Sequence, residues 1–541
     1  MQFIKNPILP GFHPDPSITR VGEDYYIATS TFHWSPGVAI YRSRDLQNWT
    51  IASRPLDRVS QLNLHGVEPS GGVFAPCLSY CDGLYYLFYT NVLAHLTDFM
   101  ECHNYIVTAE DIKGPWSEPI YIHSIGFDPS LFHDDDGRKW VLSVLRRYRV
   151  DGDDCHMAGI VMQEYDPIAQ KLIGPIKRIC EGRGSGLHGA EGPHLYKRKG
   201  YYHLLIAEGG TQYGHAVSMF RSKDIWGPYE PNPYNPILTA RDDLTLPLQR
   251  AGHADLVDTP DGETYITYLC GRPLPPYRRC ILGRETAIQK AVWGSDGWLR
   301  MARTTRHSEI ETEAPKSSQQ IMSPQLIQKL YTFSSQEPLD EDFLFLRNRP
   351  ENGYLNLTAR PGFLRLVGQD SPNSRFSQTL IARRQTAFDF TVSTRVNFHP
   401  LSERQMAGLI YIYDENNFYY AHITCNWNNE HIICLMEMER GKASYYQTEA
   451  ITLPKESGVE LRLGVSSVAG QFFYNLKDES SEAEWMELGL EIDASRLSDE
   501  YPYYGENAYT GAMIGMACHD MQYRNAVADF FRFEYIEKKN C

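Results

Sequence analysis

The sequence predicts an all-β protein of two domains, a five-bladed β-propeller followed by a β-sandwich. Three observations carry this prediction. A short motif recurs five times in the first half of the chain, an aromatic strand follows each copy, and the strand pattern changes beyond residue 310. A chain of 541 residues also exceeds what one hydrophobic core usually serves, which favours two or more domains.

The recurring motif divides the first domain, predicted at residues 1–310, into five units. Its copies begin at Asp15, Ala75, Asp128, Gly192 and His253. The intervals are 60, 53, 64 and 61 residues (75−15, 128−75, 192−128 and 253−192). Each copy leads through a turn into an aromatic strand, as at residues 25–27 and 85–87. Four-stranded propeller blades have this size once loops are included, and such repeated units bury their faces by stacking on their neighbours.

The second domain is predicted at residues 336–541, after a polar stretch at 311–335 that reads as a linker. Beyond this stretch, alternating strands occur at 388–392, 408–413 and 418–423, with polar turns between them. Many short strands without helical periodicity are typical of a β-sandwich, which we therefore expect here.

The composition argues against nucleic-acid and membrane partners. Lys and Arg number 52 against 67 Asp and Glu, which gives a net charge of −15, and no basic cluster stands out. No apolar run is long enough to cross a bilayer. Aromatic residues make up 12% of the chain, with 35 Tyr, and this composition suits β-sheets and sugar-binding surfaces.

The cysteines and the N-terminus predict a cytoplasmic protein. The 11 cysteines are scattered without CxxC pairs, which fits reduced thiols better than disulfides or a zinc site. The first residues lack the apolar core of a signal peptide and lead almost directly into the first repeat.

Three carboxylic acids are predicted to converge on the axis of the propeller. Asp15 and Asp128 occupy the same motif position, and Glu191 lies directly before the fourth copy. The innermost strand of each blade lines the central channel, so equivalent residues face one cavity. Clustered carboxylates repel one another and their pKa values separate, which yields one proton donor and one acceptor. The structural alternative for Asp15 is a turn, which an acid before proline often starts.

Two carboxylates in one cavity are sufficient for the hydrolysis of a glycosidic bond. The sequence contains no phosphate-binding loop, no HExxH zinc motif and no dinucleotide-binding fingerprint in a strand–turn–helix context, so no competing chemistry is indicated. We therefore expect a hydrolase that requires no cofactor.

Several segments combine into a specific pattern. In the first domain they are residues 6–18 (NPILPGFHPDPSI), 126–130 (GFDPS), 191–194 (EGPH) and 282–286 (LGRET). In the second domain they are residues 405–409 and 510–512. Together these segments resemble glycoside hydrolase family 43, and more narrowly its two-domain β-xylosidases with a C-terminal β-sandwich.

The resemblance implies roles for the acidic residues and for two basic ones. Asp15 would be the general base that activates water, Glu191 the general acid, and Asp128 the residue that orients Glu191 and tunes its pKa. Enzymes of that family invert the anomeric configuration. Arg284 would bind sugar hydroxyls. His253 would lie beneath the substrate, where some members bind a divalent cation such as Ca²⁺, and the resemblance leaves a metal at His253 open.

The resemblance also implies the walls of the sugar pocket. Phe32 would form one wall, and Tyr509 would reach in from the sandwich to close it. Phe74 and Arg146 stand where the family usually has tryptophan. These two changes leave the preferred sugar open, because indole stacking is lost and a polar contact is gained.

The predicted function is that of an exo-acting, inverting β-1,4-xylosidase, which releases xylose from the non-reducing ends of xylo-oligosaccharides. α-L-Arabinofuranosidase activity is expected as a side reaction, and as the main activity on arabinose-bearing oligosaccharides it is the first alternative. Two further alternatives are a retaining glycosidase with Asp15 as nucleophile and a non-catalytic carbohydrate-binding propeller. Family members are often dimers or tetramers, so a homo-oligomer is expected.

Overall fold

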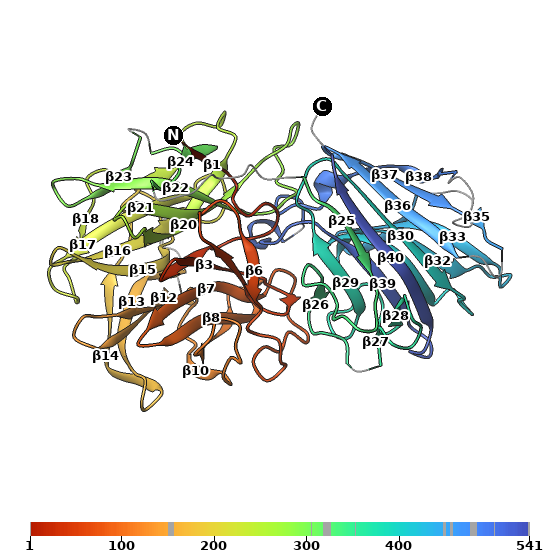
Figure 1. Cartoon of the computed structure of the whole chain (residues 1–541), viewed down its shortest axis with the longest axis horizontal. Helices are drawn as coiled ribbons and strands as arrows, with labels where there is room; N and C mark the ends of the chain where they lie inside the picture. The colour runs from red at the N-terminus through yellow and green to blue at the C-terminus, as the bar shows by residue number, and fades with distance from the viewer. Residues whose placement is uncertain are drawn as a thin grey trace.

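Two β-rich domains lie side by side in the computed structural model, the propeller at the left of Figure 1 and the sandwich at the right. The structure describes residues 2–149, 156–303, 306–316, 326–351, 353–446, 451–454, 458–476, 484–502 and 504–538. The helices in these residues are two 3-10 turns, Ala494–Arg496 and Gly505–Asn507, and neither has the length to span a membrane. The predicted all-β class is confirmed.

The first domain has five antiparallel sheets of consecutive strands, which confirms the predicted five-bladed propeller. Blade one consists of β2 (Ser17–Val21), β3 (Asp24–Thr29), β5 (Ala39–Ser43) and β6 (Thr50–Ser53). Blade two consists of β7 (Gly72–Cys81), β8 (Leu84–Ala94), β9 (Glu101–Ala109) and β10 (Ile120–His123). Blade three consists of β11 (Ser130–His133), β12 (Lys139–Arg146), β13 (Met157–Asp166) and β14 (Lys171–Cys180).

The last two blades follow the same plan. Blade four consists of β15 (Glu191–Arg198), β16 (Tyr201–Glu208), β17 (Ala216–Ser222) and β18 (Glu230–Pro231), with β19 (Leu238–Thr239) paired to β17. Blade five consists of β20 (Gln249–Asp258), β21 (Thr264–Gly271), β22 (Glu285–Trp293) and β23 (Leu299–Met301). Each predicted aromatic strand is thus the second strand of its blade.

The first strand of every blade is the innermost one, and these strands close a ring. Each of β2, β7, β11, β15 and β20 contacts the next, and β20 contacts β2. Asp255 of β20 helps to close the ring, because it accepts hydrogen bonds from the Ser17 hydroxyl at 2.9 Å and from the Ile18 N–H at 2.8 Å. The Tyr196 hydroxyl of blade four donates to the same carboxylate. One buried side chain therefore joins blades one, four and five.

The second domain is a sandwich of two antiparallel sheets, as predicted. One sheet has the order β27 (Leu355–Asn356), β28 (Leu364–Val367), β40 (Val527–Glu537), β30 (Phe390–Phe398), β36 (Val459–Ser466), β37 (Ala469–Asn475) and β38 (Met486–Asp493). The other has the order β34 (Lys442–Tyr445), β33 (His431–Glu439), β32 (Asn417–Cys425), β31 (Gln405–Asp414), β39 (Met513–Asp520), β29 (Thr379–Arg384) and β26 (Leu344–Leu346), with β35 (Ile451–Thr452) paired to β33. Apolar side chains from both sheets form one core between them.

The boundary between the domains differs from the prediction that residues 311–335 form a linker. The stretch begins with β24 (Glu311–Glu313), which pairs with β1 (Phe3–Lys5) and fastens the two ends of the propeller. Near its end lies β25 (Gln328–Thr332), which pairs with β40 of the sandwich. Residues 317–325 lie outside the described part of the chain. Both strands escaped prediction because strands at sheet edges expose much of their surface and can be polar.

The two domains are joined by shared strand pairing and by buried polar contacts. β4 (Trp34–Ser35) comes from the propeller segment but pairs with β26 of the sandwich. Nε of the buried Arg347 donates to the carbonyl of Val67 at 2.9 Å, and Nε of Arg384 donates to the carbonyl of Phe12 at 2.6 Å. Such contacts hold the sandwich in a set position against the propeller.

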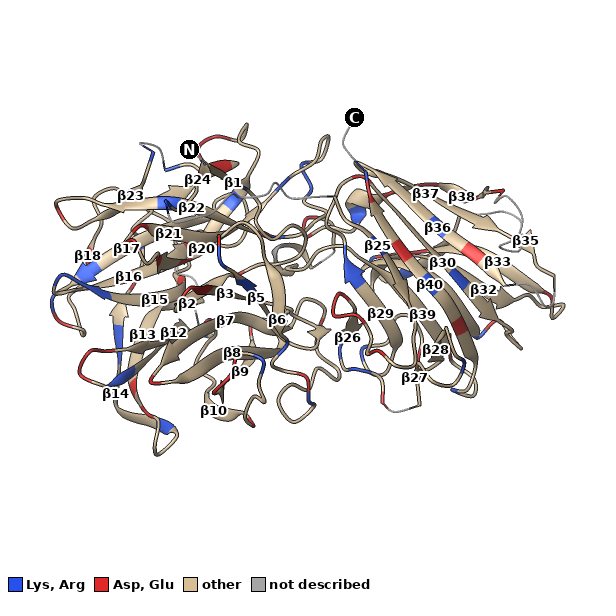
Figure 2. Cartoon of the chain, in the orientation of Figure 1, with Lys and Arg blue, Asp and Glu red and all other residues tan. Residues whose placement is uncertain are grey.

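Charged residues of both signs are distributed over both domains. Figure 2 shows Lys and Arg interspersed with Asp and Glu along the strands and loops of the propeller and of the sandwich. The absence of a nucleic-acid partner stays a prediction, which rests on the net charge and on the lack of a basic cluster in the sequence.

Candidate active site

A cavity of about 420 Å³ opens at one end of the propeller, and residues of the sandwich form part of its wall. The nine residues predicted for the site all line it: Asp15, Asp128, Glu191, Arg284, His253, Phe32, Phe74, Arg146 and Tyr509. Those from the propeller lie near the start of a first strand or near the end of a second strand, except Arg284, which directly precedes the third strand of blade five. In an antiparallel blade these two points meet at the same end, so residues far apart in sequence surround one space.

The backbone adopts the same unusual conformation at four equivalent motif positions. The φ angle is 55° at Asp15, 52° at Asp128, 55° at Gly192 and 45° at His253. This left-handed region is costly for residues other than glycine, and the packed blades around it maintain it here. At Gly192 a Cβ atom would lie 2.8 Å from Nε2 of His253, so there is no room for a side chain. The fourth blade therefore presents its carboxylate from the preceding residue, Glu191.

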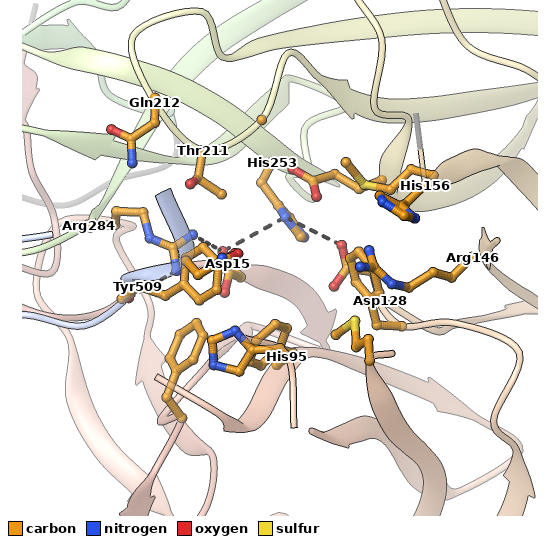
Figure 3. A pocket seen from close by; sticks show the side chains of 18 of the residues that line it. Asp15, His95, Asp128, Arg146, His156, Thr211, Gln212, His253, Arg284 and Tyr509 are labelled. Atoms are coloured by element: carbon orange, nitrogen blue, oxygen red, sulfur yellow. Dashed lines mark hydrogen bonds and ion pairs between the residues drawn. The ribbon is translucent and has the colours of Figure 1, made fainter. Parts of the chain in front are cut away.

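Asp15 is buried, and both of its carboxylate oxygens accept hydrogen bonds. The Ser30 hydroxyl donates to Oδ2 at 2.6 Å, and Nη1 of Arg284 donates to Oδ1 at 3.1 Å. Figure 3 shows Asp15 with Arg284 on one side and His253 on the other. These donors fix the orientation of the carboxylate and leave lone pairs that can accept a proton from water.

Glu191 and Asp128 are buried in the same cavity, and both have raised pKa values. Burial and then the charge of Asp15 raise the pKa of Glu191 to about 7, against the lowering effect of Arg284. Burial and the charges of Glu191 and Asp15 raise the pKa of Asp128 well above its ordinary value, although the Gly192 N–H donates to it at 3.0 Å. Oε1 of Glu191 has no hydrogen-bond partner among the described residues. The pair of Glu191 and Asp128 therefore keeps a proton near neutral pH, and Oε1 of Glu191 can form a hydrogen bond with a ligand.

His253 lies between the two aspartates. Its Nδ1 is 3.8 Å from Oδ1 of Asp15 and 4.0 Å from Oδ2 of Asp128 (Figure 3). Burial is the main cause that lowers the pKa of His253 to about 4, so the ring is neutral at pH 7. A neutral imidazole near two carboxylates offers suitable donor atoms for a divalent cation. Across the described residues, no group of three or more His, Cys, Asp or Glu is arranged to hold a metal ion, and the metal at His253 stays a prediction.

Tyr509 brings the sandwich domain into the cavity. Its carbonyl accepts a hydrogen bond from Nη2 of Arg284 at 3.0 Å, and its ring centroid lies 5.9 Å from that of Phe32 and 5.6 Å from that of Phe74. The Arg284 guanidinium is 5.4 Å from the Phe32 ring and 5.5 Å from the Tyr509 ring. Gly283 has a φ of 70° and lets the propeller backbone approach the sandwich segment that carries Tyr509. A Cβ atom on Gly283 would lie 2.5 Å from the carbonyl oxygen of Thr510.

Comparison with known proteins identifies the family to which this cavity belongs. Residues 4–299 match the family described as glycosyl hydrolases family 43. The chain belongs to glycosyl hydrolase family 43. Residues 331–536 match the concanavalin A-like domain found at the C-terminus of β-xylosidases, so both domains of this family 43 enzyme have known counterparts.

Individual relatives match the family 43 enzyme over its whole length. A protein named xylosidase/arabinosidase 43B from Humicola insolens is 47% identical over 99% of this chain and 98% of its own. A β-xylosidase from Bacillus subtilis (strain 168) is 42% identical over 99% of this chain and 100% of its own. The crystal structure of a xylan β-1,4-xylosidase from Bacillus halodurans C-125 has a TM-score of 0.94 and 45% identity, with 99% of this chain and 100% of that chain covered. The predicted glycoside hydrolase is confirmed.

Several residues that line the cavity of the family 43 enzyme were missed by the sequence analysis. They are His95, Met100, Phe127, His156, Met157, Gly209, Gly210, Thr211, Gln212 and Asn507. Figure 3 shows His95, His156, Thr211 and Gln212 around the three central side chains Asp15, Asp128 and His253. Most of the missed residues lie in loops that follow the second strand of a blade. The repeat itself was the signal, because it determines which loops meet at the motif end of the axis.

Arg250 anchors the segment that carries Tyr509 to the propeller of the family 43 enzyme. Its side chain is fully buried, and Nε donates to the carbonyl of Thr211 at 2.9 Å. Nη2 lies 3.1 Å from Asp499 and Nη1 lies 3.0 Å from Glu500, both in the sandwich domain. One guanidinium thus connects a loop that lines the cavity with the segment that closes it.

Replacing Arg250 with methionine is expected to destabilise the enzyme by about 3–5 kcal/mol, because Asp499 would be left buried without its cation. The value of kcat/KM should also fall, since the segment that carries Tyr509 loses its anchor. Thermal denaturation and steady-state kinetics measure the two effects. Arg300→Met removes a partly exposed ion pair with Asp296 and should change little. An unchanged melting temperature in Arg250→Met would contradict the anchoring role.

Proposed function

We propose that this enzyme is an exo-acting, inverting β-1,4-xylosidase that releases xylose from the non-reducing ends of xylo-oligosaccharides. The observation that supports this proposal most directly is that one cavity holds two different carboxyl groups. Both oxygens of Asp15 accept hydrogen bonds, and the pKa of Glu191 is raised to about 7. A cavity of about 420 Å³ with Tyr509 in its wall suits a chain end better than the middle of a chain. Relatives named xylosidase support xylose as the sugar.

In the proposed reaction Asp15 takes a proton from a water molecule, whose oxygen attacks the anomeric carbon. Glu191 gives its proton to the glycosidic oxygen as the bond from that oxygen to the anomeric carbon breaks. Exchange with solvent then removes the proton from Asp15 and restores the one on Glu191. Asp128 and Glu191 would repel each other if both were charged, so one of the two carboxyl groups keeps its proton. Arg284 holds Asp15 and is available to the sugar hydroxyls.

The sugar preference is tested by initial rates on p-nitrophenyl β-D-xylopyranoside and p-nitrophenyl α-L-arabinofuranoside, measured side by side. We propose arabinofuranoside hydrolysis as a side activity, since the Humicola insolens relative is named a xylosidase/arabinosidase. A clear xyloside preference supports the proposal. An arabinofuranoside preference would make that activity the principal one and would mean that Phe74 and Arg146 reshape the pocket. Inactivity of the folded protein on both substrates would overturn the proposed function.

The pH dependence of kcat should have a basic limb near pH 7. The pKa of Glu191 is raised to about 7, so its proton is present below that pH and is lost above it. Because the protonated form is the one that acts as the acid, kcat should fall as the pH rises past about 7. The limb should disappear in Glu191→Gln assayed on an activated aryl xyloside. A limb that persists in that variant would belong to another group.

We also propose that the reaction needs no cofactor, that the enzyme forms a homodimer or homotetramer, and that it works in the cytoplasm. The nine cysteines in the described residues are all free and most are buried, which suits a reducing compartment.

Loss of activity with EDTA and its recovery with Ca²⁺ would contradict the proposal that no cofactor is needed and would favour a metal at His253. Light scattering measures the oligomeric state.

A further inference from the structure

Arg146 is a cation in the cavity wall that has no partner in the described part of the chain. It is the last residue of β12, and its N–H donates to the carbonyl of Ile125 at 3.0 Å, which fixes its backbone. Its Nε is buried and without a hydrogen-bond partner among the described residues. Arg146 as a whole is half-buried, whereas the fully buried Arg284 and Arg250 each have an acidic partner, Asp15 and Asp499 respectively.

The position of Arg146 places it on the side of the cavity from which the leaving group departs. Figure 3 shows Arg146 and Arg284 on opposite sides of the aspartates. Arg146 is directly paired with Met157 across β12 and β13. A Cβ atom on Gly189 would lie 2.9 Å from Cε of Met157, so this pair adjoins the loop that leads into Glu191. Glu191 protonates the departing oxygen in the proposed function, so the sugar attached to that oxygen would lie on the Arg146 side of the cavity.

An arginine in this setting favours an anionic ligand group. Arg146 is half-buried, and withdrawing its Nε from water without a hydrogen-bond partner is costly. A ligand carboxylate would offset that cost with charge-assisted hydrogen bonds to the guanidinium. The same carboxylate would be repelled by Asp15, Asp128 and Glu191 if no cation stood between. Arg284 is already paired with Asp15, so Arg146 is the cation available to an acidic ligand in this cavity.

We propose that Arg146 makes the enzyme prefer xylo-oligosaccharides whose sugar on the leaving-group side carries a uronic acid. The carboxylate of the uronic acid would bind the guanidinium while xylose occupies the cavity next to Asp15 and Glu191. This inference rests on the proposed xylosidase function and specifies its substrate class. Arg146 acts on specificity, and the bonds made and broken remain those of the hydrolysis.

The test compares two substrates that differ only in charge. One is xylotriose with glucuronic acid on its middle xylose, and the other is the same compound with the carboxylate reduced to an alcohol. Xylose release by the wild type should be about 10- to 100-fold more efficient, in kcat/KM, on the acidic compound, the size expected of a charge-assisted pair. Added salt should reduce this preference. In Arg146→Gln the preference should vanish, because kcat/KM should fall more on the acidic compound than on the reduced one.

Arg147→Gln is the matched control, since Arg147 is exposed and does not line the cavity, and it should keep the preference. An equal rate on the two compounds in the wild type, or an equal loss on both in Arg146→Gln, would overturn the inference. Plain xylotriose, measured in the same series, separates the two hypotheses. Hydrolysis of xylotriose without an acidic preference overturns the inference alone, whereas no hydrolysis of any of the three overturns the proposed function as well.

Discussion

Replacing Glu191 with glutamine is expected to slow the hydrolysis of xylobiose by about 10²- to 10⁴-fold, the usual contribution of a general acid. Glutamine preserves the size of the side chain but has no acidic proton for the glycosidic oxygen. p-Nitrophenyl β-D-xylopyranoside should lose much less, because p-nitrophenolate leaves without needing a proton. The ratio of the two losses therefore reports the acid role of Glu191 directly.

The control for this experiment is Glu110→Gln, at an exposed position outside the cavity, which should leave both rates unchanged. A melting temperature close to that of the wild type shows that Glu191→Gln is folded. Equal losses on xylobiose and the aryl xyloside would contradict the assignment, because a residue that only shapes the pocket affects both leaving groups alike.

Replacing Asp15 with asparagine should reduce the rate on both substrates by a similar factor, of about 10²- to 10⁴-fold. Water must be activated whatever group leaves, so a better leaving group does not rescue the variant. Asparagine can still accept a hydrogen bond from Ser30 but no longer carries the charge that pairs with Arg284. Thermal denaturation distinguishes the loss of a base from the loss of a stable cavity.

Proton NMR of the first-formed sugar completes the test of Asp15. If Asp15 activates water, the hydrolysis of a β-xyloside first yields α-xylose, since water attacks the face opposite the leaving group. First formation of β-xylose would show retention, and Asp15 would then be a nucleophile that forms a covalent intermediate. That result would favour the retaining alternative and replace the inverting mechanism.

The repeat was enough to predict the propeller and its three carboxylates. Motif copies at intervals close to sixty residues define blades, and residues at one motif position must point toward one axis. Asp15 and Asp128 follow this rule directly. Glu191 departs from it by one residue, and the sequence alone offers no reason. The structure does, because a side chain at Gly192 would collide with His253.

Other features depend on contacts between residues that are distant in sequence. The ion pair of Arg250 with Asp499 joins residues 249 positions apart, and no local sequence pattern predicts it. β4 belongs by sequence to the propeller, yet it pairs with β26 of the sandwich. The strands β24 and β25 are short and polar, so their pairing with β1 and β40 was hidden within an apparent linker.

The sequence by itself determined the β class, the two domains, the blade count and the convergence of Asp15, Asp128 and Glu191 on one cavity. These features are encoded locally and repeated, so a period and a motif are sufficient to read them. Only the tertiary structure decided the boundary of the domains, the burial that raises the pKa of Glu191 to about 7, and the isolation of Arg146 in the cavity wall. Burial and the lack of a hydrogen-bond partner are properties of the whole folded chain. Both depend on which residues, distant in sequence, pack around the side chain and exclude water from it.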